Sequence, residues 1–103
     1  MHAIMEIIKN IEGAKETFTI KGNLDTITSP DLQKELDALD SSVKELVFDF
    51  ALLDYISSAG LRVMLTANKK MVASGGSMTI ANTKPEVREV FDMTGFSDIF
   101  MMV

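Results

Sequence analysis

The sequence predicts an α/β fold in which helices cover a mixed, mostly parallel sheet of four to five strands. Short apolar segments with strand-like alternation are interspersed with longer segments whose apolar residues recur at helical spacing. The expected order is β-β-α-β-α-β-α, and strands that alternate with helices are typical of parallel sheets. The length of 103 residues suits one domain, which we expect to span residues 1–103.

The chain is expected to begin with a hairpin. Residues 3–11 and 16–21 are rich in apolar and β-branched side chains and are predicted to form two strands. Gly13 lies between them, where a tight turn needs a residue that tolerates unusual backbone angles. A loop is predicted over residues 22–28.

A helix and a central strand should follow the hairpin. Ser29 is expected to cap the helix, because its hydroxyl can accept the first free amide hydrogens and Pro30 suits the first helical position. Apolar residues then recur at helical spacing: Leu32, Leu36, Leu39 and Val43. The nearly continuous apolar run over 46–50 predicts a strand buried on both faces, hence central and parallel to a neighbour.

The second half is predicted to hold two helices around one strand. Residues 51–57 are expected to be a loop, and residues 58–73 a helix that ends at Ser74-Gly75-Gly76. Its apolar stripe comprises Leu61, Met64, Leu65, Met71 and Val72. Residues 78–81 should form a strand, and Thr83 with Glu86 resembles a capping box at the start of the last helix.

The composition excludes several classes of function. The formal net charge is −5, so a basic surface for nucleic acid or for an anionic membrane is not expected. Cysteine is absent, which excludes disulfides and thiol chemistry, and the single histidine, His2, lies near the N-terminus, where chain ends fray. No cofactor-binding or metal-binding motif occurs. We therefore expect a cytoplasmic binding or regulatory protein with no catalytic residues, no cofactor and no metal.

Two serines at the start of the second predicted helix are the main candidate site. Ligands of parallel sheets bind beyond the carboxyl ends of the strands, here the loops 22–28, 51–58 and 81–84. Ser57 and Ser58 lie in the second of these loops, where serines most often serve as helix caps. Small residues follow them, so the surface around Ser58 is expected to be open to a partner or to a kinase. A phosphate there would add a charge of about −1.5 to −2.

Four segments carry a resemblance to a known family. Residues 51–65 (ALLDYISSAGLRVML) resemble the signature of the STAS domain family, and residues 22–25 (GNLD) resemble the segment before its first helix. Residues 84–87 (KPEV) and 91–96 (FDMTGF) resemble its last helix and the turn after it. The chain is therefore similar to stand-alone bacterial anti-sigma factor antagonists over nearly its whole length.

The resemblance implies a function that is switched by phosphorylation. Ser58 matches the serine phosphorylated by the anti-sigma factor, which is itself a serine kinase, and a PP2C-type phosphatase reverses the reaction. The unphosphorylated form would bind the anti-sigma factor and release the sigma factor. The expected partner-binding residues are Asp25, Ser57, Ser58, Ala59, Gly60, Leu61 and Arg62.

One position departs from the family pattern. The family often has Asp immediately before the phosphorylated serine, and this chain has Ser57 there. Ser57 is therefore a second candidate acceptor. The departure also motivates an alternative function, in which the chain is an unswitched scaffold or an accessory subunit of a signalling or lipid-transport complex.

Other charged residues have simpler interpretations. Asp49 lies in a predicted strand like the acceptor of a receiver domain, but the other acidic and basic residues of such a site are missing, which favours a hydrogen-bonded structural role. Asp54 is interpreted as a turn-former, with the alternative that its carboxylate substitutes for the Asp that the family has at position 57. Arg62 and Lys69 lie one heptad apart on a helix, either as a solvated face or as contacts for an acidic partner.

Overall fold

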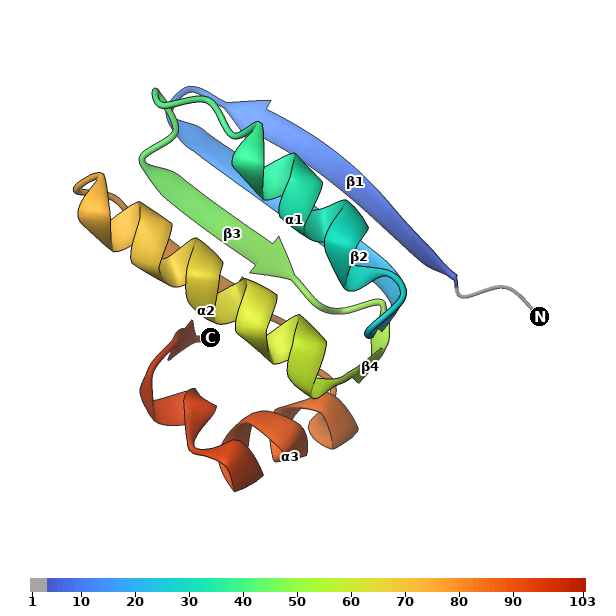
Figure 1. The fold of residues 1–103 in the computed structure, drawn as a ribbon. Coiled ribbons are helices and arrows are strands. Elements are labelled where there is room, and N and C mark those ends of the chain that lie inside the picture. Colours follow the sequence, from blue (N-terminus) through green and yellow to red (C-terminus); the bar gives the residue numbers. More distant parts are fainter. Residues whose placement is uncertain (1–3) are drawn as a thin grey trace.

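The structure, a computed structural model, describes residues 4–103 and confirms the predicted α/β fold class (Figure 1). The expectation for His2 lies outside these residues. The elements in chain order are β1 (Met5–Glu12), β2 (Lys15–Leu24), α1 (Ser29–Asp37), β3 (Glu45–Asp49), β4 (Leu53–Ile56), α2 (Ser58–Ala73), β5 (Ser77–Ala81), α3 (Pro85–Thr94), the 3₁₀ helix η1 (Phe96–Asp98) and β6 (Met101–Met102).

The sheet has six strands, where the sequence predicted four to five. Its order is β1-β2-β3-β5-β6, and β4 pairs separately with the far end of β2. The predicted hairpin is present, with β1 antiparallel to β2 and Gly13 at a φ of +62°. Every other pairing is parallel, and β3 lies between β2 and β5 as the central strand.

Two of the strands lie in segments that the sequence did not predict as strands. β4 occupies most of the predicted loop 51–57, and its two ends, Leu53 and Ile56, are buried while the residues between them are exposed. β2 continues to Leu24, so the predicted loop 22–28 begins only at Asp25. β6 is formed by the apolar tail, which pairs with β5 at the edge of the sheet.

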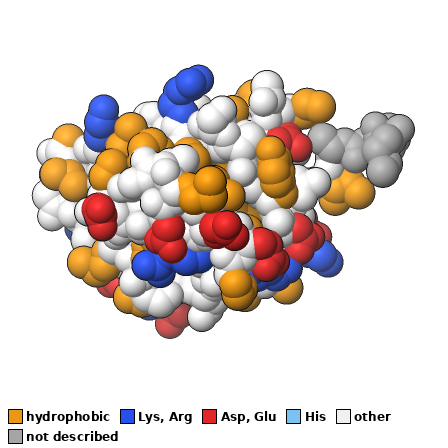
Figure 2. All heavy atoms as spheres, turned by 90° about the horizontal axis from the view of Figure 1, so that it is seen from below, with side chains coloured by type: hydrophobic (Ala, Val, Ile, Leu, Met, Phe, Trp, Pro, Cys, Tyr) orange, Lys and Arg blue, Asp and Glu red, His pale blue; other side chains and the backbone are white. Residues whose placement is uncertain are grey.

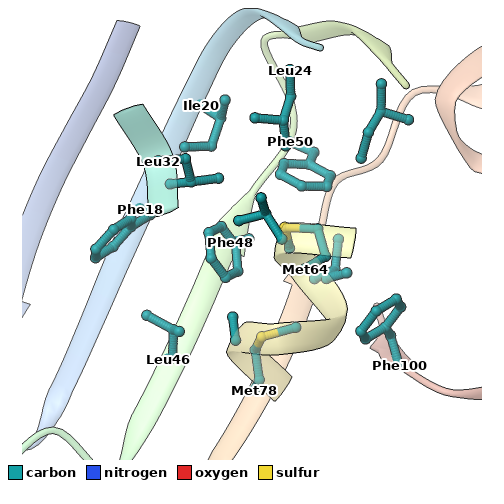
Figure 3. Packing of buried hydrophobic residues seen from close by; sticks show 14 of the residues in the cluster. Phe18, Ile20, Leu24, Leu32, Leu46, Phe48, Phe50, Met64, Met78 and Phe100 are labelled. Carbon is teal, nitrogen blue, oxygen red and sulfur yellow. The ribbon is translucent and has the colours of Figure 1, made fainter. Parts of the chain in front are cut away.

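The core lies on one face of the sheet, beneath α1 and α2 (Figure 1). Alternate residues of β2, β3 and β5 point into it, and Figure 3 shows Phe18, Phe48 and Met78 from these strands, together with Met64 of α2, among its side chains. Val47 and Asp49 on the opposite face are only half-buried. The prediction that this central strand is buried on both faces is therefore wrong, because the helices leave one face of the sheet uncovered.

Helix α2 is the main cover of the core. Its buried residues are Gly60, Leu61, Val63, Met64, Ala67 and Met71. Val72, which was predicted to belong to this stripe, is 65% exposed, because the next residue of a helix points about 100° away from a buried one. The helix ends as predicted, at Ser74 with Gly75 at a φ of +79°.

Two predicted helix caps are wrong. Helix α1 has Thr28 at its N-cap position, and the hydroxyl of Ser29 is buried without a hydrogen-bond partner. Helix α3 has Lys84 at its N-cap position, and the Thr83 hydroxyl is likewise buried without a partner. Within residues 4–103 neither helix has a side-chain cap; before α1, the Asp25 carboxylate accepts a hydrogen bond from the amide of Thr28, the N-cap residue itself.

Candidate functional site

The ends of β2 and β4 lie side by side and bring two of the predicted loops together. Leu24 is paired with Ile56 in this parallel ladder, and the Ser57 amide donates a 2.9 Å hydrogen bond to the Leu24 carbonyl oxygen. The residues that follow these strands, Asp25 on one side and Ser58 on the other, therefore share one rim of the molecule. This is the carboxyl-end edge where the sequence placed the site.

The two serines at the start of α2 have different environments. Ser57 is half-buried, and its hydroxyl accepts a 3.4 Å hydrogen bond from the Gly60 amide, so it is the cap of the helix. Ser58 is the first residue of the helix, and its side chain is exposed. Ser57 therefore caps the N-terminus of α2, while the Ser58 hydroxyl is exposed to solvent.

The small residues after the serines pack against the chain itself. Gly60 is buried, and a Cβ atom there would lie 2.8 Å from the Leu24 carbonyl oxygen and 2.8 Å from Cγ1 of Ile56. Leu61 is 4% exposed. The surface that we expected to be accessible to a partner is therefore formed by exposed Ser58 and half-buried Ala59. Gly60 and Leu61 are buried beneath it and support the rim.

Asp25 shapes the loop beside Ser58. Its carboxylate accepts hydrogen bonds from the backbone amides of Thr28 (3.0 Å) and Ile27 (2.9 Å) and from the Thr28 hydroxyl. These bonds, led by that from the Thr28 amide, hold the pKa of Asp25 below its usual range. The Asp25 side chain therefore remains anionic at neutral pH and fixes the turn that leads into α1.

The other two acidic candidates make structural contacts. Asp49 accepts hydrogen bonds from the Ala51 amide and from the side chain of Asn82, which confirms its predicted role as a hydrogen-bonded carboxylate. Asp54 forms an ion pair with Lys84 and lies within β4, so its interpretation as a turn-former is wrong. The first set of contacts joins the end of β3 to the residue after β5, and the ion pair joins β4 to the N-cap residue of α3.

A groove opens next to Ser58, between the start of α2 and the end of α3. We call it the α2–α3 groove; its volume is about 250 Å³, and its lining residues are Ser58, Leu61, Arg62, Leu65, Thr94 and Phe96. Sequence reasoning missed Thr94 and Phe96 as site residues, because only the fold brings the end of α3 to α2. The adjacent Gly95, at a φ of +80°, is the signal that the chain turns there.

Arg62 and Lys69 are both exposed on α2. The ion pairs among residues 4–103 join Lys9 to Glu35, Lys84 to Asp54 and Arg88 to Asp92, so neither Arg62 nor Lys69 takes part in one.

Between residues 4 and 103, no three acidic or histidine side chains lie close enough together to hold a metal ion. Within the same residues, every helix is too short or too polar to cross a membrane.

Comparison with known proteins identifies the family. The family model described as the STAS domain matches residues 3–103. The chain is a member of the STAS domain family. This STAS domain is 40% identical over 82 residues to BtrV of Bordetella bronchiseptica, which is assigned as an anti-sigma factor antagonist; the match covers 79% of this chain and 71% of BtrV. It is 30% identical over 80 residues to the anti-sigma-B factor antagonist of Bacillus subtilis, covering 78% and 73%.

Solved structures share the fold of this STAS domain. An anti-sigma factor antagonist from Mycobacterium paratuberculosis superposes with a TM-score of 0.86 at 19% identity, covering 97% of this chain and 86% of that one. SpoIIAA in its unphosphorylated form gives 0.75 at 18% identity, with 97% and 87% coverage. The phosphorylated form of Bacillus SpoIIAA gives 0.74 at 18% identity, with 97% and 91% coverage.

Proposed function

We propose that this STAS domain is an anti-sigma factor antagonist that phosphorylation of Ser58 switches off. The unphosphorylated chain binds an anti-sigma factor that is also a serine kinase, and this binding releases a sigma factor. A PP2C-type phosphatase restores the binding form. The names of the two relatives support the antagonist role, and the two SpoIIAA structures support a phosphorylated state for a protein of this fold.

The observation that carries the proposal is that the two serines differ in their contacts: one is the helix cap, and the other is exposed to solvent. The Ser57 hydroxyl is engaged by the Gly60 amide, whereas Ser58 is exposed on the rim that it shares with Asp25. A kinase can therefore reach Ser58 without opening the helix. Ser57 would have to give up its cap, which is worth about 1 kcal/mol.

A phosphate on Ser58 acts on the interface and leaves the fold intact. Ser58 is the first residue of α2, where the helix dipole favours negative charge. The charge of about −1.5 to −2 is therefore tolerated within the domain. A partner that packs over Ala59 meets a bulky anion that it must either pair or leave desolvated, and an unpaired buried charge is costly.

The test begins with the kinase. The Ser58→Ala chain serves as bait in a lysate of the source bacterium, and a captured serine kinase is identified by mass spectrometry and purified. Wild-type chain is then incubated with that kinase and ATP, and the modified residue is mapped. We expect phosphate on Ser58 in the wild type and in Ser57→Ala, and none in Ser58→Ala. Phosphate on Ser57, or none at all, contradicts the proposal.

A further inference from the structure

The α2–α3 groove combines an apolar floor with one cation. Leu61, Leu65 and Phe96 supply the apolar part, and Arg62 is the charged residue among those that line it. We propose that this groove anchors a segment of the partner that presents one bulky apolar side chain with a carboxylate beside it. The inference rests on the proposed function, because it takes the partner to be the serine kinase that binds this rim.

The size of the groove favours a single side chain over a larger ligand. Sites for drug-sized molecules and cofactors usually measure about 300–1,000 Å³, whereas this groove measures about 250 Å³. A cavity of about 150 Å³ is large enough for benzene. The groove therefore has room for a phenyl-sized or leucine-sized side chain and part of its neighbour.

The charges around the groove determine where the carboxylate lies. Arg62 is exposed and belongs to none of the ion pairs among residues 4–103. Across the groove, α3 exposes three acidic residues, Glu86, Glu89 and Asp92, against one cation, Arg88, which is paired with Asp92. Figure 2 shows acidic side chains with basic ones among them on the face that carries α3, and the exposed charges of α3 leave an acidic excess there. A carboxylate of the partner is repelled from that face, so it lies over α2, against Arg62.

The groove is also coupled to Ser58. Ser58 and Arg62 line the same groove and are four residues apart on α2, a spacing at which the Cβ atoms of a helix lie about 6 Å apart. A phosphate on Ser58 therefore competes with the partner's carboxylate for Arg62. Phosphorylation then occupies Arg62, the cation among the lining residues, in addition to repelling the partner.

A small probe tests the chemistry without any partner. 4-Phenylbutyrate carries a phenyl group and a carboxylate, and 4-phenylbutan-1-ol is its uncharged analogue. Both are titrated into ¹⁵N-labelled protein, and amide shifts are followed by NMR. We expect shifts at the residues that line the groove for 4-phenylbutyrate, at least threefold weaker binding of the alcohol, and no shifts in a chain synthesised with phosphoserine at position 58. Shifts elsewhere, or equal binding of the two probes, overturn the proposal.

Two matched pairs of variants test the anchor with the purified kinase. Thr94→Phe fills the groove, and Val72→Phe adds the same side chain at an exposed position near the far end of α2, outside the groove lining. Arg62→Gln removes the groove's cation, and Lys69→Gln removes a cation outside its lining. We expect Thr94→Phe to weaken kinase binding at least tenfold and Arg62→Gln at least threefold, with both controls within twofold of wild type.

The outcomes separate this inference from the proposed function. Equal affinities of Thr94→Phe and Val72→Phe, with Ser58 still phosphorylated, overturn the anchor and leave the switch standing. A chain that the kinase neither binds nor phosphorylates removes the switch and the anchor together. Concentration-dependent shifts of the lining residues in the free protein would assign the groove to a second copy, and a copurified acyl chain would assign it to a lipid. Either result overturns the proposal.

Discussion

The amide of Ser57 is joined to the carbonyl oxygen of Leu24 by a 2.9 Å hydrogen bond, which links the end of β4 to the end of β2. Three residues later, Gly60 packs so closely on Leu24 that a Cβ atom there would lie 2.9 Å from its Cγ. The exposed Ser58 lies between these two contacts. The rim that carries it is therefore held by the backbone and by the core, and the Ser58 side chain takes no part in that support.

Gly60→Ala should destabilise the domain by about 1–3 kcal/mol, because the added methyl group has no room against Leu24 and Ile56. Helix propensity alone predicts the opposite sign, since alanine is favoured over glycine inside a helix by about 1 kcal/mol. The reciprocal change Ala59→Gly, at the neighbouring half-buried position, measures that propensity on the same turn. Urea unfolding of both variants decides between steric destabilisation and stabilisation by helix propensity. A Gly60→Ala chain that is more stable than wild type would show that the added methyl group fits beside Leu24 and Ile56.

Alanine at the two serines should have unequal effects on stability. Ser57→Ala removes the hydroxyl that accepts from the Gly60 amide, so we expect a loss of about 1 kcal/mol. Ser58→Ala changes an exposed side chain and should stay within about 0.5 kcal/mol of wild type. Denaturant titration measures both values. A larger loss for Ser58→Ala than for Ser57→Ala would reverse the assignment of cap and exposed hydroxyl.

Asp25 should give the domain a stability that disappears in acid. Its pKa is lowered in the folded state, so its contribution is present above the usual carboxyl pKa of about 4 and is lost as the pH falls through the lower folded value. The difference in unfolding free energy between wild type and Asp25→Asn should therefore be largest near neutral pH and shrink below about pH 4. Asp37→Asn, at an exposed carboxylate, is the control. A difference that does not change with pH would argue against these hydrogen bonds.

Glu16 should behave in the opposite way. It is 6% exposed, and burial raises its pKa, with Lys9 opposing this shift and Glu35 and Asp40 adding to it. Folding therefore works against the ionised form at neutral pH, and this penalty disappears as the pH falls below the usual value of about 4.3. Glu16→Gln should have a higher Tm than wild type at pH 7 and a smaller advantage near pH 4. Glu45→Gln, at an exposed position of the neighbouring strand β3, is the control.

Periodicity and local chemistry were enough to predict most elements of the fold. The buried alternation of β2 and the turn at Gly13 can be recognised in the sequence because they depend on neighbouring residues. β4 could not, because its four residues are buried only at the two ends and are ordered by pairing with β2. The start of α1 was predicted at Ser29, but its cap was mispredicted, because the helix already includes Ser29 and follows a turn in which Asp25 accepts the Thr28 amide.

The candidate site was predicted in part. Two adjacent serines before a helix indicate that one of them is the cap, but which one depends on the three-dimensional position of the Gly60 amide. Gly60 was interpreted as a sign of an open surface, whereas its missing Cβ accommodates Leu24 of the same chain. The groove brings together residues more than thirty positions apart, and no local pattern predicts such a meeting.

The central claim is tested most directly by installing phosphoserine at position 58 of the full chain. Two quantities are measured on the same sample: the free energy of unfolding, and the affinity for the purified kinase by calorimetry. We expect unfolding within about 0.5 kcal/mol of the unmodified chain, together with a loss of kinase affinity of at least a hundredfold. An unchanged affinity, or a domain that no longer folds, would contradict a switch that acts at the interface of an intact structure.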